Sequence, residues 1–260
     1  MDYCSLLIAA ILFFQHFHGA CADDTAETEN RYTKKAGSPR CKNKPHYCRA
    51  TDGPTKPKCD INSMKPCYKE RMVFESLGTK HVLCDTKTDG GGWVIFQRRV
   101  KGGVNFTKSW AEYRDGFGSF DGDFWIGNQF IHQLTTAGYT DMRVDMKYQG
   151  RHYYARYKNF VLSNETLFYR INFNSYTGNA SNSLDQNPNR GFATFDSGPA
   201  VSSHCARAFG GGWWYRDCGS AMLNGVWGSR GYGLGIYWTT VTGVYNSLSF
   251  VEMKVRKPNP

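Results

Sequence analysis

Short apolar runs, several alternating with polar residues, recur from residue 81 to the end of the chain. Alternation at every second position is typical of β-strands that bury one face. Residues 140–162 alternate on both sides of Gln149-Gly150, which suits a tight turn between two antiparallel strands. Further strands are predicted in residues 81–86, 91–100, 169–178 and 246–257.

Two segments instead show the spacing of a helix. Phe130, Ile131 and Leu134 share one helical face, and Gly138 stands where such a helix commonly ends. Residues 109–117 have similar spacing. Few short helices among many antiparallel strands predict an α+β fold rather than a wound parallel sheet.

The N-terminal part has a different texture. Residues 1–22 contain the apolar run Leu6–Phe14 and end in Ala20-Cys21-Ala22, so they predict a secretory signal peptide; an N-terminal anchor or core helix is the alternative. The apolar run is too short to span a bilayer, and no other run approaches that length. Residues 23–66 are polar and rich in lysine and proline, which predicts an irregular segment.

Charge is distributed unevenly along the chain. The formal net charge is +10, and residues 31–71 carry twelve Lys or Arg against three acidic residues. A basic segment can bind anionic glycans, nucleic acid or membranes, but a solvated linker is the simpler interpretation. We expect no nucleic-acid partner and no transmembrane segment. A heparin-type binder acting through this segment remains an alternative.

Secretion would place the cysteines in an oxidising compartment, where they form disulfides. An odd number remains after removal of residues 1–22, so one thiol is free or joins another chain; cleavage before Cys21 would restore an even number. A disulfide-linked homo-oligomer through Cys41, Cys48 or Cys59 is one consequence. The seven remaining cysteines are Cys41, Cys48, Cys59, Cys67, Cys84, Cys205 and Cys218.

The stretch CARAFGGGWWYRDCGSAMLNGVWG, from Cys205 to Gly228, concentrates glycine, tryptophan and cysteine. Adjacent residues such as His204 and Cys205 rarely form a base and nucleophile pair. In a secreted chain, Cys205 is instead expected to bond to Cys218. Its aromatic residues could line a pocket, with Trp213 or Trp214 in the core. The chain has no C-x-x-C motif, and neither glycine run is followed by G-K-[ST], so we expect neither a zinc site nor a phosphate loop.

Long motifs in a fixed order carry a resemblance to a known family. They are CDTKTDGGGWVIFQRR, SWAEYRDGFGSFDGDFWIGNQFIHQLT, FATFD, HCARAFGGGWWYRDC, LNGVWG and SLSFVEMKVR. Together they resemble the fibrinogen-related domain of ficolins, tachylectins and angiopoietins, and look most like its invertebrate, molluscan-type immune lectins. The resemblance covers residues 67–257.

This resemblance implies a mainly antiparallel sheet with a loop-rich binding subdomain near the C-terminal end. It implies disulfides Cys67–Cys84 and Cys205–Cys218, with Cys59 as a competitor for the first pairing. Three N-glycosylation sequons fit a secreted domain of this kind, at Asn105, Asn164 and Asn179.

In lectin members of the family, a funnel beside the second disulfide binds the acetyl group of N-acetylated sugars. The resemblance assigns its aromatic walls to Phe209 and Tyr232, and the backbone amide that meets the acetyl oxygen to Gly233. It also implies a cis peptide bond between Asp217 and Cys218.

Three positions depart from the family pattern. Gly219 stands where histidine is usual, and Val244 aligns with a further wall tyrosine, so polar contacts are lost. Asp196 matches the first carboxylate of a calcium loop, but Gly198 replaces the second. Calcium is therefore expected to bind weakly or not at all.

The sequence predicts a secreted, extracellular, non-enzymatic lectin that binds glycans on microbial or foreign surfaces in innate immunity. The alternative is a secreted protein ligand or effector, angiopoietin-like or toxin-like, that presents the same loops to a protein partner.

Overall fold

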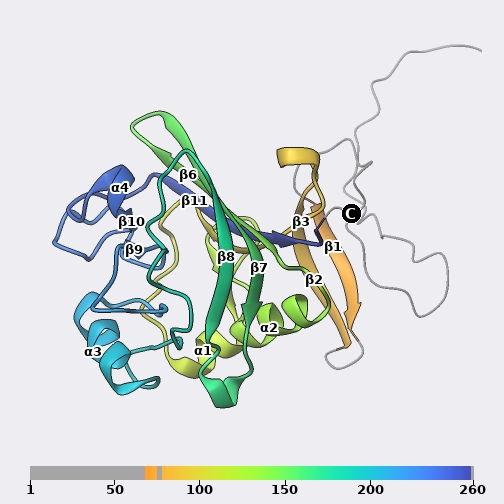
Figure 1. The fold of residues 1–260 in the computed structure, drawn as a ribbon, viewed down its shortest axis with the longest axis horizontal. Coiled ribbons are helices and arrows are strands. Elements are labelled where there is room, and N and C mark those ends of the chain that lie inside the picture. The colour runs from red at the N-terminus through yellow and green to blue at the C-terminus, as the bar shows by residue number, and fades with distance from the viewer. Residues whose placement is uncertain (1–67, 75–77, 259–260) are drawn as a thin grey trace, which may run out of the picture. The chain divides into compact units, whose positions relative to one another are not determined.

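A computed structural model describes residues 68–74 and 78–258 (Figure 1). The predicted signal peptide (1–22), the basic segment (23–66) and Cys67 lie outside the described residues. Predictions that concern Cys41, Cys48, Cys59 and the Cys67–Cys84 bond therefore stay predictions.

Among the described residues, nine strands form one antiparallel sheet. The alternating pattern predicted six of them, and those at residues 68–74, 117–118 and 124–125 were not predicted. The main path of the sheet runs β1-β2-β3-β11-β6-β7-β8, and β5 joins β4 to β3. The C-terminal strand therefore lies in the middle of the sheet. The strands are β1 (Tyr68–Phe74), β2 (Gly78–Asp85), β3 (Trp93–Arg99), β4 (Phe117–Gly118), β5 (Phe124–Trp125), β6 (Asp141–Tyr148), β7 (Arg151–Leu162), β8 (Ile171–Gly178) and β11 (Phe250–Arg256).

The predicted hairpin joins β6 to β7. Gln149 and Gly150 have φ angles of 48° and 77°, as the two central residues of a type I′ turn require. This turn fixes the register in which Tyr148 pairs with Arg151 and Met142 with Tyr157.

Both predicted helices are present, as α1 (Trp110–Asp115) and α2 (Asn128–Thr136). Ser109 and Glu112 form a capping box at the start of α1. Phe130, Ile131 and Leu134 of α2 are buried as their spacing predicted. The described part of the chain also contains two 3₁₀ turns, η1 (Thr88–Gly90) and η2 (Glu165–Leu167).

The remaining elements form a loop-rich region that we call the C-terminal lobe, residues 200–249 (left in Figure 1). It contains α3 (Ala200–Phe209), the strand pair β9 (Ala221–Met222) and β10 (Tyr237–Trp238), and α4 (Thr239–Thr242). This arrangement agrees with the α+β fold and the C-terminal loop-rich subdomain that the resemblance implied. Helix α3 was not predicted, although Gly210, in the left-handed region, ends it as a glycine commonly does.

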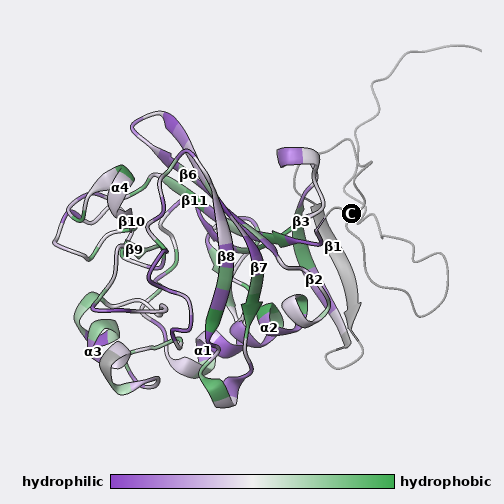
Figure 2. Ribbon diagram, in the orientation of Figure 1, coloured by the Kyte–Doolittle hydropathy of each residue, from purple (hydrophilic) through white to green (hydrophobic). Residues whose placement is uncertain are grey.

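The hydrophobic core lies against one face of the sheet. Val251, Met253 and Val255 of β11 point into it and are fully buried. Hydrophobic colour appears on β7, β8, β11 and α3, whereas η1 and the tip of the β6–β7 hairpin are hydrophilic (Figure 2). Trp213 and Trp214 are both fully buried core residues, with ring centroids 5.2 Å apart.

The polar face of β11 is buried as well. The Nζ atom of Lys254, a residue only 2% exposed, lies 2.6 Å from Asp85, 2.7 Å from Asp145 and 3.4 Å from Glu252. Burial disfavours the charged ammonium, but these carboxylates outweigh it and raise the pKa of Lys254. We call these four residues the ionic cluster.

Candidate functional site

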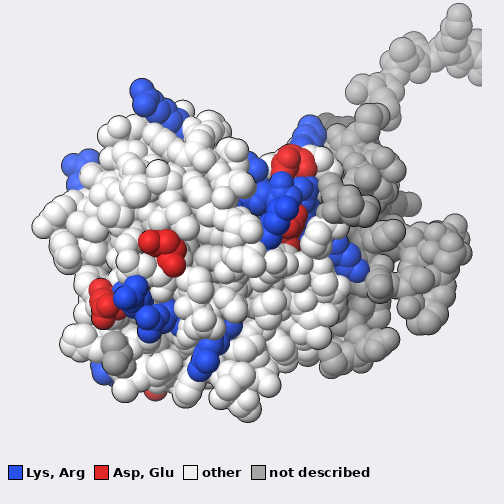
Figure 3. Space-filling view, viewed as in Figure 1, with Lys and Arg blue, Asp and Glu red and all other residues white. Residues whose placement is uncertain are grey.

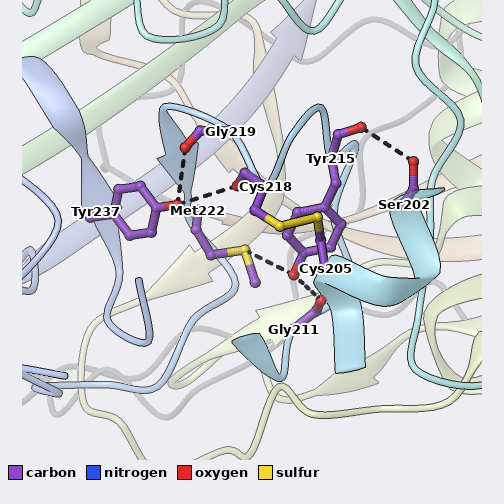
Figure 4. The surroundings of a disulfide bond; sticks show 8 residues. All are labelled: Ser202, Cys205, Gly211, Tyr215, Cys218, Gly219, Met222 and Tyr237. Atoms are coloured by element: carbon purple, nitrogen blue, oxygen red, sulfur yellow. Dashed lines mark hydrogen bonds between the residues drawn. A yellow bond between two sulfur atoms is a disulfide. The ribbon is translucent and has the colours of Figure 1, made fainter. Parts of the chain in front are cut away.

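The Cys205–Cys218 disulfide joins α3 to the loop that follows it (Figure 4). The bond closes a 13-residue separation, as the sequence and the resemblance indicated. Its formation leaves Cys205 without a thiol, so Cys205 is not a nucleophile beside His204.

Two tyrosine hydroxyls hold this loop from within. Tyr215 donates to the carbonyl oxygen of Gly211 at 2.5 Å, and Tyr237 lies 3.4 Å and 3.3 Å from the carbonyl oxygens of Cys218 and Gly219 (Figure 4). Burial raises the pKa of Tyr237 to about 12, so its hydroxyl stays protonated and can donate at neutral pH.

The turn at the second cysteine differs from the expectation. The Asp217–Cys218 peptide bond is not cis. Instead, Asp217, Cys218 and Gly219 have φ angles of 44°, 63° and 84°, and this left-handed run reverses the chain. Within the described part of the chain, the N–H groups of these three residues donate no hydrogen bond.

Three aromatic rings come together beside α3. Tyr232 lies between the other two, with ring centroids 6.4 Å from Phe209 and 5.4 Å from Tyr245. Phe209 is four residues after Cys205 on α3, which places it one turn along the same helical face. We call Phe209, Tyr232, Gly233 and Tyr245 the aromatic patch.

Gly233 allows the patch to close. Its φ angle is +68°, and a Cβ atom added there would lie 2.5 Å from the ring of Phe209. However, its N–H donates to the carbonyl oxygen of Val244 at 2.9 Å. Gly233 is therefore a packing residue, and its amide is not available to an acetyl oxygen as the resemblance implied.

Tyr245 is an exposed ring of the aromatic patch that the resemblance did not assign. Val244 aligns with the family's wall tyrosine, but it packs against the core. Its neighbour Tyr245 is 58% exposed and faces Tyr232, itself 61% exposed. Aligning the family's wall tyrosine one residue later in this sequence would have identified Tyr245.

Asp196 has a structural role in this loop. Its carboxylate accepts hydrogen bonds from the Trp110 N–H at 2.9 Å and the Thr194 hydroxyl at 2.7 Å, which ties this loop to the start of α1. In the described ranges, no group of three or more His, Cys, Asp or Glu side chains could hold a metal. This single carboxylate does not fit a calcium ion, which takes about six to eight oxygen ligands.

The three sequon asparagines are all exposed, but their side chains are used differently. Asn105 accepts the Thr107 N–H, and Asn164 accepts the Thr166 hydroxyl, each at 2.8 Å. Asn179 bonds to the backbone of β7 through both amide atoms.

The comparisons with known proteins agree with this architecture. Residues 69–259 match the family described as fibrinogen beta and gamma chains, C-terminal globular domain. The chain belongs to the fibrinogen C-terminal domain family.

Individual relatives place this fibrinogen C-terminal domain in proteins of different kinds. It is 42% identical over 181 residues to Ryncolin-4 of Cerberus rynchops, which covers 67% of this chain and 52% of the relative. It is 40% identical over 200 residues to human Tenascin-R, which covers 76% of this chain but 14% of the relative. The chain therefore spans about half or less of these curated relatives.

Solved structures show the same fold. The fibrinogen-like globe domain of human ANGPTL2 superposes with a TM-score of 0.70 at 35% identity, covering 76% of this chain and 94% of that one. Lamprey fibrin D-dimer, solved with the peptide Gly-His-Arg-Pro-amide, superposes with a TM-score of 0.64 at 29% identity, covering 74% of this chain and 69% of that one. Among the described residues, no helix combines the length and apolar character that crossing a bilayer requires.

Proposed function

We propose that this protein is a secreted, non-enzymatic lectin whose aromatic patch receives the acetyl group of N-acetylated glycans on microbial or foreign surfaces. The observation that carries the proposal is the exposure of two rings, Tyr232, which contacts Phe209, and Tyr245, which contacts Tyr232. Solvent-exposed rings suit the apolar side of the acetyl group, and the N–H groups of residues 217–219, which donate no hydrogen bond to the described residues, suit its polar side.

The distribution of charged side chains supports a neutral ligand. On the face shown in Figure 3, charged side chains are few over the C-terminal lobe, whereas Lys, Arg, Asp and Glu gather beside η1. A neutral acetyl group needs no counter-charge, so this distribution suits it better than an ionic ligand.

The test is retention of the secreted protein on N-acetylglucosamine beads. We expect retention that acetate competes and that EDTA leaves unchanged, because Asp196 does not fit calcium. Tyr232→Ala should lose retention, because it removes the ring that contacts both Phe209 and Tyr245. Tyr148→Ala, which changes a half-buried tyrosine of β6, is the matched control and should be retained. Equal retention of the two variants would exclude the aromatic patch as the site.

A protein or peptide ligand is the second candidate. Gly219 lacks the expected histidine side chain, and the amide of Gly233 is already bonded, so acetyl recognition loses two contacts. Lamprey fibrin D-dimer, which shares this fold, was solved with a peptide ligand, and this supports a peptide as the alternative ligand. Two results together would favour this candidate. The wild type would not be retained on the N-acetylglucosamine beads, and it would bind a Gly-His-Arg-Pro-amide probe that Tyr232→Ala no longer binds.

Single lectin sites bind weakly, so useful avidity needs several linked copies. We propose that Cys41, Cys48 or Cys59 links copies covalently. Reducing and non-reducing gels of the secreted protein should then differ; identical mobility would exclude a disulfide-linked oligomer.

A further inference from the structure

Asn105 lies in the wall of a groove outside the aromatic patch. The groove has a volume of about 280 Å³, and its lining includes Val104, Asn105, Phe106, Val226 and Trp227. We call it the Asn105 groove.

The groove offers an apolar surface of fixed shape. Trp227 lies against Gly102, where an added Cβ would come within 2.3 Å of the indole ring, so only glycine lets the ring pack there. Beside it, Val226 is 49% exposed. These two side chains supply a stable apolar wall that the described residues leave open to solvent.

The charged group of the groove is already occupied. Arg99 is 1% exposed, donates to the carbonyl oxygen of Gly225 at 2.9 Å, and stacks on Phe106 with its guanidinium carbon 3.7 Å from the ring centroid. Asp123 lies 3.6 Å from its Nε atom. An ionic ligand would find no unpaired counter-charge in Arg99, so a neutral occupant with an apolar face suits the groove best.

The side chain of Asn105 has its reactive nitrogen free. Its Oδ1 accepts the Thr107 N–H, and its Nδ2 makes no hydrogen bond to the described residues. Asn179 is the contrast, because its Nδ2 lies 3.3 Å from the His152 carbonyl oxygen and its Oδ1 accepts the Tyr154 N–H at 2.7 Å.

We infer that Asn105 carries an N-linked glycan whose first sugars lie in the Asn105 groove, against Trp227 and Val226. In the transfer, Nδ2 bonds to the anomeric carbon of a lipid-linked oligosaccharide pyrophosphate. The bond from that carbon to the pyrophosphate breaks, and Nδ2 loses one proton. The apolar C–H face of a pyranose ring then covers the exposed side chains, which removes their surface from water.

This inference shares with the proposed function only the passage of the chain through the secretory pathway. It does not depend on what the aromatic patch binds, so failure of bead retention leaves it intact. A chain that is not secreted would contradict both proposals.

The experiment uses the full chain secreted from eukaryotic cells. Peptide mass spectrometry measures occupancy at Asn105, and an endoglycosidase then releases the glycans from the folded protein. We expect Asn105 to be occupied and Trp227→Ala to accelerate release at Asn105 about fivefold, since the lost apolar contact no longer shields the first sugars. Release at Asn164, on a separate loop, should not change, and Thr107→Ala should abolish the Asn105 signal.

Val226→Ser is the second variant, because it alters an exposed side chain and avoids the packing of Trp227 on Gly102. It should also accelerate release at Asn105, by a smaller factor. Two results would overturn the inference: secreted protein without a glycan at Asn105, or a release rate there that neither variant changes.

Discussion

The sheet and the C-terminal lobe obtain their order in different ways. In the sheet, long antiparallel ladders such as β6–β7 and β11–β6 repeat the same hydrogen bonds, and even the charged residues of β11 are buried and paired. In the lobe, β9 and β10 have two residues each. There the backbone is held by a disulfide, by glycines in the left-handed region and by buried tyrosine hydroxyls.

This difference separates stability from recognition. A loop held by individual contacts can expose large aromatic rings, because no repeating ladder determines which side chains point inward. Tyr232 and Tyr245 are exposed in this way. We therefore expect changes in the sheet to alter stability without changing ligand specificity, and changes in the lobe to alter both.

The largest effect is expected in the ionic cluster. Lys254→Met would remove the ammonium partner of the buried Asp85 and Glu252 and of the half-buried Asp145. Glu252 keeps Arg98, and Asp145 keeps Arg143. Among the described residues, Asp85 is left without a cation, so the free energy of unfolding should fall by about 3 kcal/mol. Urea denaturation measures it. Lys87→Met, at an exposed lysine, is the control and should change little. A loss below ~1 kcal/mol for Lys254→Met would mean that the cluster does not stabilise the sheet.

The second effect is expected at the disulfide. Replacing Cys205 and Cys218 by alanine removes the bond that closes this loop. A disulfide that closes a loop of this length typically stabilises the folded state by about 3 kcal/mol, so the free energy of unfolding should fall by a similar amount. Hydrogen exchange should accelerate in the C-terminal lobe, whereas amides of β6 and β7 should exchange by global unfolding alone. Uniform acceleration in both regions would show that the lobe is not an independent unit of stability.

A third prediction concerns the closure of the aromatic patch. Gly233→Ala places a Cβ on the Phe209 ring at a positive φ angle, so it should cost about 1–3 kcal/mol and reduce ligand retention. Gly103→Ala, where an added Cβ meets open space, should be nearly neutral in both measurements. Full retention by Gly233→Ala would place the ligand elsewhere.

The smallest effect is expected at the capping box of α1. Hydrogen bonds from Lys108 and from Ser109 lower the pKa of Glu112 to about 2. Because the folded-state pKa is depressed, this carboxylate contributes stability above its unfolded pKa of about 4.5, and the contribution is lost as the pH falls toward 2.

Glu112 is largely exposed, so the contribution should stay below about 0.5 kcal/mol after solvent screening. Thermal unfolding of wild type and Glu112→Gln should therefore differ slightly at pH 7 and converge near pH 2. A gap that widens on acidification would contradict the assignment.

The local pattern of the sequence was sufficient for much of the sheet. Gln149-Gly150 predicted the β6–β7 turn, and Phe130, Ile131 and Leu134 predicted the buried face of α2. These features depend on residues close together in sequence, whose periodicity and turn preferences act before any tertiary contact forms. The same holds for the Cys205–Cys218 loop, whose two cysteines are near neighbours in sequence.

The site depended on contacts that no local pattern contains. The Gly233 amide is bonded to Val244, Tyr245 rather than Val244 faces Tyr232, and Asp196 is bonded to Trp110, 86 residues away. The alternation of β11 predicted a polar face for this strand. That face can be buried because Lys254 is paired with Asp85, 169 residues earlier in the chain, and with Asp145.

The sequence by itself thus determined six strands of the sheet, helices α1 and α2 and the two cysteines that close the loop, because periodicity and turn chemistry are local. It did not determine β1, α3 or the short strands, whose residues carry no such pattern. The tertiary structure decided which polar groups are satisfied and which rings remain exposed. Each of those outcomes depends on the distance between side chains that are far apart along the chain.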